Sequence, residues 1–98
     1  MKLSLKITLI AVIILATFIA FRNEIAWFAW EQYKLEKLSF LLAPKDATLL
    51  AIMGHYYFNG GDYDLEKAEL FYHRSLLADP DKFIARYQLA RVYFIKGL

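Results

Sequence analysis

Cysteine is absent from the 98 residues of this chain, which excludes a disulfide framework, a thiolate metal site and a catalytic thiol. The absence does not indicate a compartment, because a helical domain without disulfides folds on either side of a membrane. Proline and glycine are scarce, with two and four residues, and these few residues delimit the helices that the sequence predicts.

A surplus of charge of one sign is lacking as well. Twelve Lys and Arg residues and ten Asp and Glu residues are spread along the chain, and the net charge is only +2. The basic residues form no stripe, so the charge pattern does not support a nucleic-acid partner.

Residues that could carry chemistry lack the neighbours that they would need. The two histidines, His55 and His73, fall in different predicted helices, without cysteines and without a partner four residues away, so we expect no metal site. No serine lies in a Gly-x-Ser-x-Gly setting, and Gly60-Gly61 has neither the preceding strand nor the following Lys-Ser/Thr of a phosphate loop. We therefore expect no enzyme activity, no cofactor and no small-molecule substrate.

Hydrophobic residues are abundant instead, at 59% of the chain, and much of the excess lies in the first thirty residues. Residues 7–21 form an apolar run without a charge. Leu3 and Leu5 extend it to about nineteen residues, and Lys2 and Lys6 can snorkel toward the headgroups, so the helix can cross a hydrocarbon core of ~30 Å. The sequence thus predicts a transmembrane anchor within residues 1–22.

The charges that border this segment predict its orientation. The amino terminus, Lys2 and Lys6 lie on one side, whereas Arg22 and Glu24 nearly cancel on the other. The positive-inside rule then places the N-terminus in the cytoplasm and the rest outside, which is the periplasm or the cell surface if the source is bacterial. A cleaved signal peptide is the main alternative, but it would place Phe18 at the −3 position, where small residues are required. A buried core helix is a weaker alternative, because the rest of the chain is too small to enclose it.

Aromatic residues follow the anchor at spacings of three. Trp27, Trp30 and Tyr33 share one helical face, and such residues prefer the membrane interface. We expect an aromatic belt at the outer leaflet, so that the membrane interface comprises Lys2, Lys6, Arg22, Trp27, Trp30 and Tyr33. The alternative is that the aromatic rings pack on the first helix of the soluble part.

Four helical segments are expected after the anchor. Residues 31–42 place four leucines on one helical stripe, namely Leu35, Leu38, Leu41 and Leu42. No helix breaker separates this segment from the anchor. We therefore predict an interfacial or linker amphipathic helix over residues 23–44, with Asn23 as a weak point. Helices over residues 47–58, 65–78 and 83–96 follow, capped by Asp46 and by Asp62 or Asp64, and the fold class is all-α.

An internal repeat is the strongest pattern in the chain. A shift of thirty-six residues aligns helix, turn and helix in one register, as duplicated helical units do. The matched pairs are Ser39 with Ser75, Leu41 with Leu77, Pro44 with Pro80, Met53 with Leu89, Gly54 with Ala90, Tyr57 with Tyr93, Phe58 with Phe94 and Gly61 with Gly97.

The complete copy, residues 49–80, resembles a tetratricopeptide (TPR) repeat, a helix–turn–helix unit that serves as a binding scaffold. Leu50 stands where the family often has tryptophan, and the turn at Gly60-Gly61 is longer than usual, which also resembles the related Sel-one-like repeats. The positions that carry the resemblance are the small residue Gly54, the aromatic Tyr57, then Ala68, Tyr72 and Ser75 of the second helix, and the closing Pro80. Residues 45–98 then form about 1.5 repeats, incomplete at the C-terminus, behind a degenerate preceding helix.

The resemblance implies that the first helix of each repeat lines a concave face. It places Thr48 and Ala51 there and, as partner-binding residues, His55, Phe58, Asn59, Ile84, Tyr87, Arg91 and Phe94. This mixture of aromatic and polar side chains suits a peptide or helix partner. Residues 83–96 are apolar on both faces, so a partner or a continuation of the array is expected to cover them.

The sequence therefore predicts a single-pass, membrane-anchored TPR-like scaffold that mediates protein–protein interaction outside the cytoplasm. Two alternatives remain open. The chain is a small structural or assembly subunit of a larger membrane complex, or it is the N-terminal part of a larger secreted TPR protein.

Overall fold

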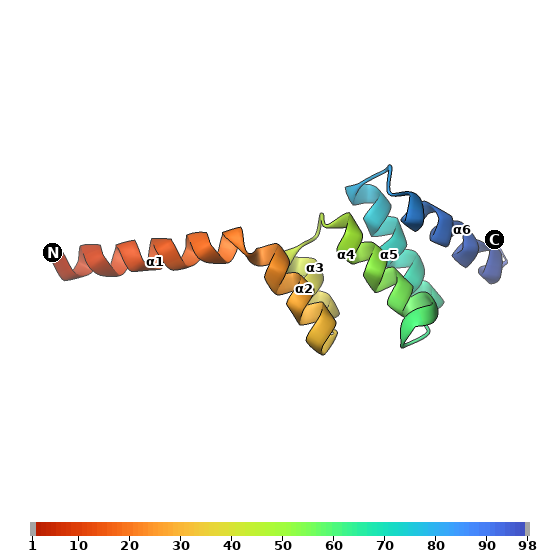
Figure 1. Ribbon diagram of the computed structural model, residues 1–98, viewed down its shortest axis with the longest axis horizontal. Coiled ribbons are helices and arrows are strands. Elements are labelled where there is room, and N and C mark those ends of the chain that lie inside the picture. Colours follow the sequence, from red (N-terminus) through yellow and green to blue (C-terminus); the bar gives the residue numbers. More distant parts are fainter. Residues whose placement is uncertain (1, 98) are drawn as a thin grey trace.

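The computed structural model describes residues 2–97, and this part of the chain is helical throughout, with no strand. Figure 1 shows one helix that projects from a row of shorter helices, and the molecule measures 66 × 26 × 15 Å. The elements are α1 (Lys2–Ala20), α2 (Arg22–Tyr33), α3 (Glu36–Leu42), α4 (Ala47–His55), the π-helical segment η1 (Tyr56–Gly60), α5 (Leu65–Ala78) and α6 (Phe83–Lys96). The predicted all-α fold class is confirmed.

Helix α1 stands apart from the core and buries none of its residues. Its 19 residues are long and apolar enough to cross a membrane, a property that a signal sequence would share. Because α1 is exposed all round, it is not a core helix of the domain.

The join between α1 and α2 lies at Phe21, two residues before the expected weak point at Asn23. Phe21 leaves the helical region with φ −107° and ψ 14°, while the Ile25 amide still donates to its carbonyl at 2.9 Å. The break coincides with the end of the apolar run, where α2 begins to bury one face with Ala26, Ala29 and Trp30.

Residues 23–44 form two helices, so the prediction of one amphipathic helix is wrong. Helix α2 ends at Tyr33, and Lys34 takes the left-handed conformation with φ 52°. The Lys34 amide donates to the Trp30 carbonyl at 2.9 Å, which is the bond of the αL C-cap motif, and the Leu35 amide donates to the Ala29 carbonyl at 3.2 Å. Glycine usually occupies this position, so a lysine there leaves no sequence mark of the turn.

Helix α3 then packs back beside α2 (Figure 1), and most of the predicted leucine stripe does not face the core. Leu35, Leu38 and Leu41 are exposed, and only Leu42 is half-buried against the core. Ser39 is fully buried and Phe40 is half-buried. The turn at Lys34 sets α3 beside α2, and the face that α3 turns inward carries Ser39.

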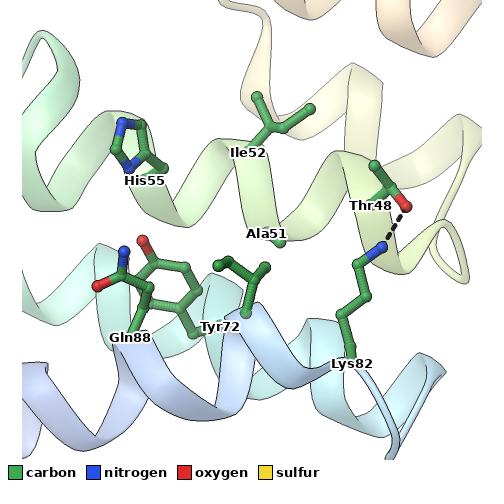
Figure 2. Close-up of a pocket in the computed structure, with 8 residues that line it drawn as sticks. Thr48, Ala51, Ile52, His55, Tyr72, Lys82 and Gln88 are labelled. Atoms are coloured by element: carbon green, nitrogen blue, oxygen red, sulfur yellow. Dashed lines mark hydrogen bonds between the residues drawn. The ribbon is translucent and has the colours of Figure 1, made fainter.

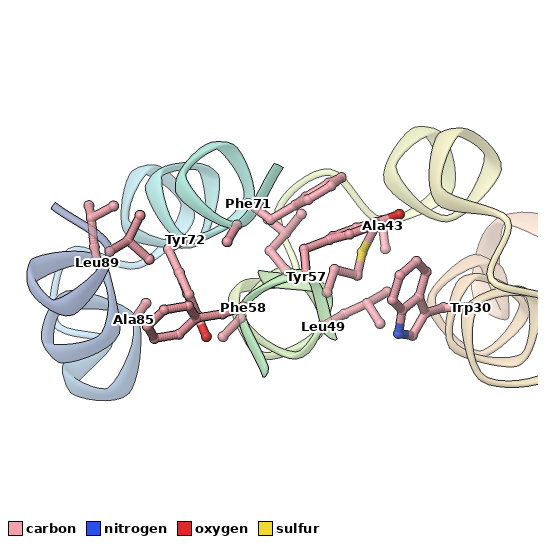
Figure 3. Packing of buried hydrophobic residues seen from close by; sticks show 14 of the residues in the cluster. Trp30, Ala43, Leu49, Tyr57, Phe58, Phe71, Tyr72, Ala85 and Leu89 are labelled. Atoms are coloured by element: carbon pink, nitrogen blue, oxygen red, sulfur yellow. The ribbon is translucent and has the colours of Figure 1, made fainter. Parts of the chain in front are cut away.

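The core runs along the row of helices. Figure 3 shows buried side chains following one another from Ala85 and Leu89 on α6, through Tyr72 and Phe58, to Leu49 and Trp30. Gly61 ends η1 close against the Tyr56 ring, where a Cβ atom would lie 2.3 Å from ring carbon Cε2, so a larger residue would require the ring to move.

Some boundaries of the helices follow the shift of thirty-six residues, although α3 and α5 begin at non-equivalent positions, Glu36 and Leu65. Helices α3 and α5 end at Leu42 and Ala78, and helices α4 and α6 begin at Ala47 and Phe83. Asp46 caps α4 by accepting from the Leu49 amide at 3.1 Å. Of the two candidates for the cap of α5, it is Asp64 that accepts from the Lys67 amide, at 3.2 Å.

Candidate interaction site

A groove lies between α4 and α6, with α5 behind it (Figure 2). It has a volume of about 250 Å³ and is lined by Thr48, Ala51, Ile52, His55, Tyr72, Lys82, Ile84 and Gln88. We call it the α4–α6 groove.

The walls of the α4–α6 groove are apolar, and its two ends are polar. Ile52 and Ile84 stand at the sides and are partly exposed, while the small side chain of Ala51 leaves depth between them. At one end the Lys82 ammonium donates to the Thr48 hydroxyl at 2.6 Å.

At the other end of the groove lie His55, which is exposed, and Gln88, which is half-buried (Figure 2). Both side chains carry hydrogen-bonding groups that a ligand in the groove could use. A mostly apolar lining with a few polar groups is the usual composition of ligand-binding pockets.

Tyr72 forms the back of the groove. Its side chain is fully buried, and its hydroxyl has no hydrogen-bond partner among the described residues. Burial raises the pKa of Tyr72 to about 12, against a smaller opposing effect of the positive charge of Arg91. The ring lies against Gly54, where a Cβ atom would come within 2.9 Å of two ring carbons, so the glycine allows α5 to approach α4 this closely.

The structure divides the predicted partner-binding residues between two surfaces. His55 and Ile84 line the α4–α6 groove, together with Thr48 and Ala51. The other surface, a separate hollow on the outer side of α6 with a volume of about 450 Å³, is lined by Tyr87, Ala90, Arg91, Phe94 and Ile95.

Two predicted partner-binding residues belong to neither surface. Phe58 is only 4% exposed, so the prediction that it contacts a partner is wrong. It packs edge-on against Tyr72 with 6.3 Å between ring centroids, and the Arg91 guanidinium lies 5.2 Å from the centre of its ring. Asn59 is exposed in the irregular turn of η1, with φ −151°, and lines neither hollow.

The prediction from sequence missed four groove residues, Ile52, Tyr72, Lys82 and Gln88. Ile52 and Gln88 are related by the same shift of thirty-six residues as Thr48 and Ile84, so the repeat itself could have identified them. Lys82 and Tyr72 come from outside the two groove helices, and the sequence does not mark them.

Trp30 is buried in the core, so its predicted place at the membrane interface is wrong. Only 2% of its surface is exposed, and its ring lies edge-on to Tyr56 at 5.3 Å and tilted to Tyr57 at 6.0 Å. The Lys34 ammonium lies 5.2 Å from the centre of the same ring. The alternative, packing within the helical domain, is what the structure has.

The other predicted interface residues are at least partly exposed. Trp27 is half-buried, and its ring N–H donates to an Asp46 carboxylate oxygen at 2.7 Å. Tyr33 is exposed and lies edge-on to Phe28 at 5.9 Å. The cations that border the anchor, Lys2, Lys6 and Arg22, are exposed at its two ends.

Polar contacts elsewhere join neighbouring helices. The Tyr57 hydroxyl donates to Glu36, which also forms an ion pair with Lys67 at 3.2 Å, and burial together with this hydrogen bond raises the pKa of Tyr57 well above its usual value. Lys96 on α6 pairs with Glu66 and Glu69 on α5, and these bonds raise the pKa of the Lys96 ammonium. Within residues 2–97, no three His, Cys, Asp or Glu residues are grouped so that they could hold a metal ion.

Comparison with known proteins does not assign this chain to a family. No protein-family model, no characterised protein and no solved structure matches this chain.

Proposed function

We propose that this protein is a membrane-anchored helical-repeat scaffold of the TPR type, displayed outside the cytoplasm. In this proposal, a peptide or helix of a partner protein binds in the α4–α6 groove. The observation that carries it is the groove itself, an apolar hollow between two helices with polar groups at both ends.

The repeat supports the scaffold part of the proposal. Some helix boundaries recur after thirty-six residues, and the equivalent serines Ser39 and Ser75 are both fully buried. Stacked helical pairs of this kind have no chemistry of their own and act through the grooves between their helices. Two pairs of positions that the shift makes equivalent line the groove, since Thr48 corresponds to Ile84 and Ile52 to Gln88.

Helix α1 supports the anchor part. An exposed helix of this length and apolarity is unfavourable in water, because each CH₂ group that is removed from water contributes ~0.8 kcal/mol of stabilisation. Lys2 and Lys6 at its start predict a cytoplasmic N-terminus. An uncleaved anchor would hold the helical domain at the outer surface of the membrane, within reach of partners there.

The absence of cysteine makes the topology simple to test. We expect a single cysteine at position 77, where Leu77 is 71% exposed, to react with a membrane-impermeant maleimide in intact cells. A single cysteine at position 2 should react only after the cells are permeabilised. The reverse pattern would contradict the proposed orientation, and a mature chain that begins after residue 20 would show a cleaved signal peptide instead.

Groove binding is testable with peptides selected from a random library on the full chain in nanodiscs. Peptides that occupy the α4–α6 groove should lose at least about tenfold in affinity for Ile52→Glu and Ile84→Glu, because each change puts a charge in an apolar wall. The control is Leu77→Glu, an equally apolar but distant exposed position, which should leave the affinity unchanged. Equal losses in all three variants would mean that the peptides do not bind in the groove.

The second candidate, a subunit of a larger membrane complex, is favoured by the all-round exposed surface of α1. The two proposals differ in where partners bind. Replacing residues 2–20 with an unrelated leucine-rich transmembrane helix should preserve peptide binding by a scaffold. The same replacement would release a subunit whose partners pack on α1 within the bilayer.

A further inference from the structure

The outer face of α6 is a second apolar surface on the domain. Its hollow, lined by Tyr87, Ala90, Arg91, Phe94 and Ile95, shares no residue with the α4–α6 groove. Phe94 is 86% exposed, and Tyr87 and Ile95 are about half exposed, at 53% and 50%. An aromatic side chain so exposed in the middle of an apolar hollow indicates a surface that another molecule covers.

The repeat within the chain shows how such a face is covered. For three of the lining residues, Tyr87, Ala90 and Phe94, the positions thirty-six residues earlier are Ala51, Gly54 and Phe58, and all three are buried. Tyr72 of α5 provides part of that cover, since its ring lies against Gly54 and edge-on to Phe58. On α6 the equivalent residues Tyr87, Ala90 and Phe94 are exposed, because no helix within residues 2–97 packs on them as α5 packs on α4.

Charge distinguishes between the occupants that could supply this cover. Helix α6 carries Arg86, Arg91 and Lys96 and no acidic residue. Lys96 is neutralised by glutamates of α5, but Arg91 bonds only to the neutral Gln88 side chain, at 3.0 Å, among the described residues. Two copies of the chain joined through their α6 faces would bring these cations together without a counter-charge, which is unfavourable.

We propose that the outer face of α6 docks an amphipathic, acidic helix of a partner protein, packed as α5 packs on α4. An aromatic side chain of the partner lies against Ala90 and next to Phe94, as Tyr72 lies against Gly54. A carboxylate of the partner pairs with Arg91. This inference does not depend on peptide binding in the α4–α6 groove, because the two surfaces have no lining residue in common.

Helix α5 itself supplies the pattern that such a partner should have. Its buried residues, Ala68, Phe71, Tyr72 and Ser75, follow the spacing i, i+3, i+4, i+7, with small residues at the ends and aromatic residues between them. Its exposed or half-exposed acids include Glu66 and Glu69. A peptide with the sequence of residues 62–80 is therefore the appropriate probe for the outer face of α6.

The test is fluorescence anisotropy of this labelled peptide with the full chain in nanodiscs. A hydrocarbon staple joining positions 73 and 77, which are exposed in α5, keeps the peptide helical, so that failure to bind cannot be a failure to fold. We expect saturable binding that weakens at least about tenfold in Phe94→Ala and in Ala90→Trp. Leu77→Ala removes a similarly exposed apolar side chain elsewhere and should change the affinity less than about twofold.

Charge reversal tests the pairing with Arg91. The variant Arg91→Glu should bind the wild-type peptide more weakly. Its affinity should recover for a peptide in which Glu66 and Glu69 are replaced by lysine. No saturable binding, or equal losses in Phe94→Ala and Leu77→Ala, would overturn the proposal. A dimer seen by light scattering and abolished by Phe94→Asp would also overturn it, because the occupant would then be a second copy. In each of these cases, peptides selected for the α4–α6 groove would still bind.

Discussion

Two buried tyrosines allow the packing of this domain to be tested with one chemical change. Tyr57 and Tyr72 are both almost fully buried, at 5% and 1% exposure, and both rings lie in the same core. They differ in their hydroxyl groups. The Tyr57 hydroxyl donates to the Glu36 carboxylate, whereas the Tyr72 hydroxyl has no partner within the part of the chain that the structure describes. Replacing each with phenylalanine removes one oxygen and leaves the ring in place.

The expected effects have opposite signs. A buried polar group without a partner costs ~1–3 kcal/mol, so Tyr72→Phe should raise the free energy of unfolding by ~1 kcal/mol or more. A hydrogen bond to a charged group contributes ~1.5–3 kcal/mol, so Tyr57→Phe should lower the free energy of unfolding by about that amount. For a domain of this size, each kcal/mol shifts the melting temperature by ~4–8 °C.

Thermal unfolding of the helical domain, followed by circular dichroism at pH 7 in detergent micelles, measures both shifts. Tyr63, which is 65% exposed, provides the matched control, and Tyr63→Phe should change the stability by less than ~0.5 kcal/mol. A lower melting temperature for Tyr72→Phe, similar to that of Tyr57→Phe, would refute the reasoning. It would mean that the Tyr72 hydroxyl is satisfied in solution, for example by the groove end at Gln88.

The same residues lead to three further predictions. Folding raises the pKa of Tyr72 from 10.0 to about 12 and that of Tyr57 further, so the folded state favours the neutral side chains. Their contribution to the free energy of unfolding is therefore complete below pH 10 and is lost as the pH rises through the pKa values of the folded state. Tyr72→Phe should reduce this loss of stability in urea titrations between about pH 9 and 12. Gly54→Leu should lower the free energy of unfolding by ~1–3 kcal/mol, because its side chain would overlap the Tyr72 ring, and unchanged thermal unfolding would contradict the packing of α5 on α4. Trp30→Ala should lower the free energy of unfolding in micelles by ~3–5 kcal/mol, as removal of a core tryptophan does, whereas Phe28→Ala, at an exposed position, should lower it far less. Equally small effects of the two changes would indicate that Trp30 lies at the membrane interface.

The sequence was sufficient to locate the helices of the second half of the chain. Their ends are marked by residues with a direct backbone role, such as the cap Asp46 and the closing Gly97, whose φ of 82° suits glycine. It was insufficient where an ordinary residue takes an unusual conformation. Lys34 in the left-handed region ends α2 without a glycine, so the sequence does not mark the turn after which α3 lies beside α2 with Leu38 and Leu41 exposed.

The site shows a similar division for a different physical reason. Periodicity identifies which residues share a helical face, and the repeat identifies equivalent positions, but neither specifies which neighbour covers a face. Phe58 and Phe94 are at equivalent positions in the sequence, yet Phe58 is buried and Phe94 is the most exposed aromatic side chain among those described. The reason is that α5 covers the face that carries Phe58, whereas no described helix covers the face that carries Phe94. Gly54 permits that packing by admitting the Tyr72 ring, and Ala90 is the nearest equivalent on α6. The difference in burial between two otherwise matching faces is therefore the part of the candidate site that only a three-dimensional structure provides, and it is the reason that a partner is expected on α6.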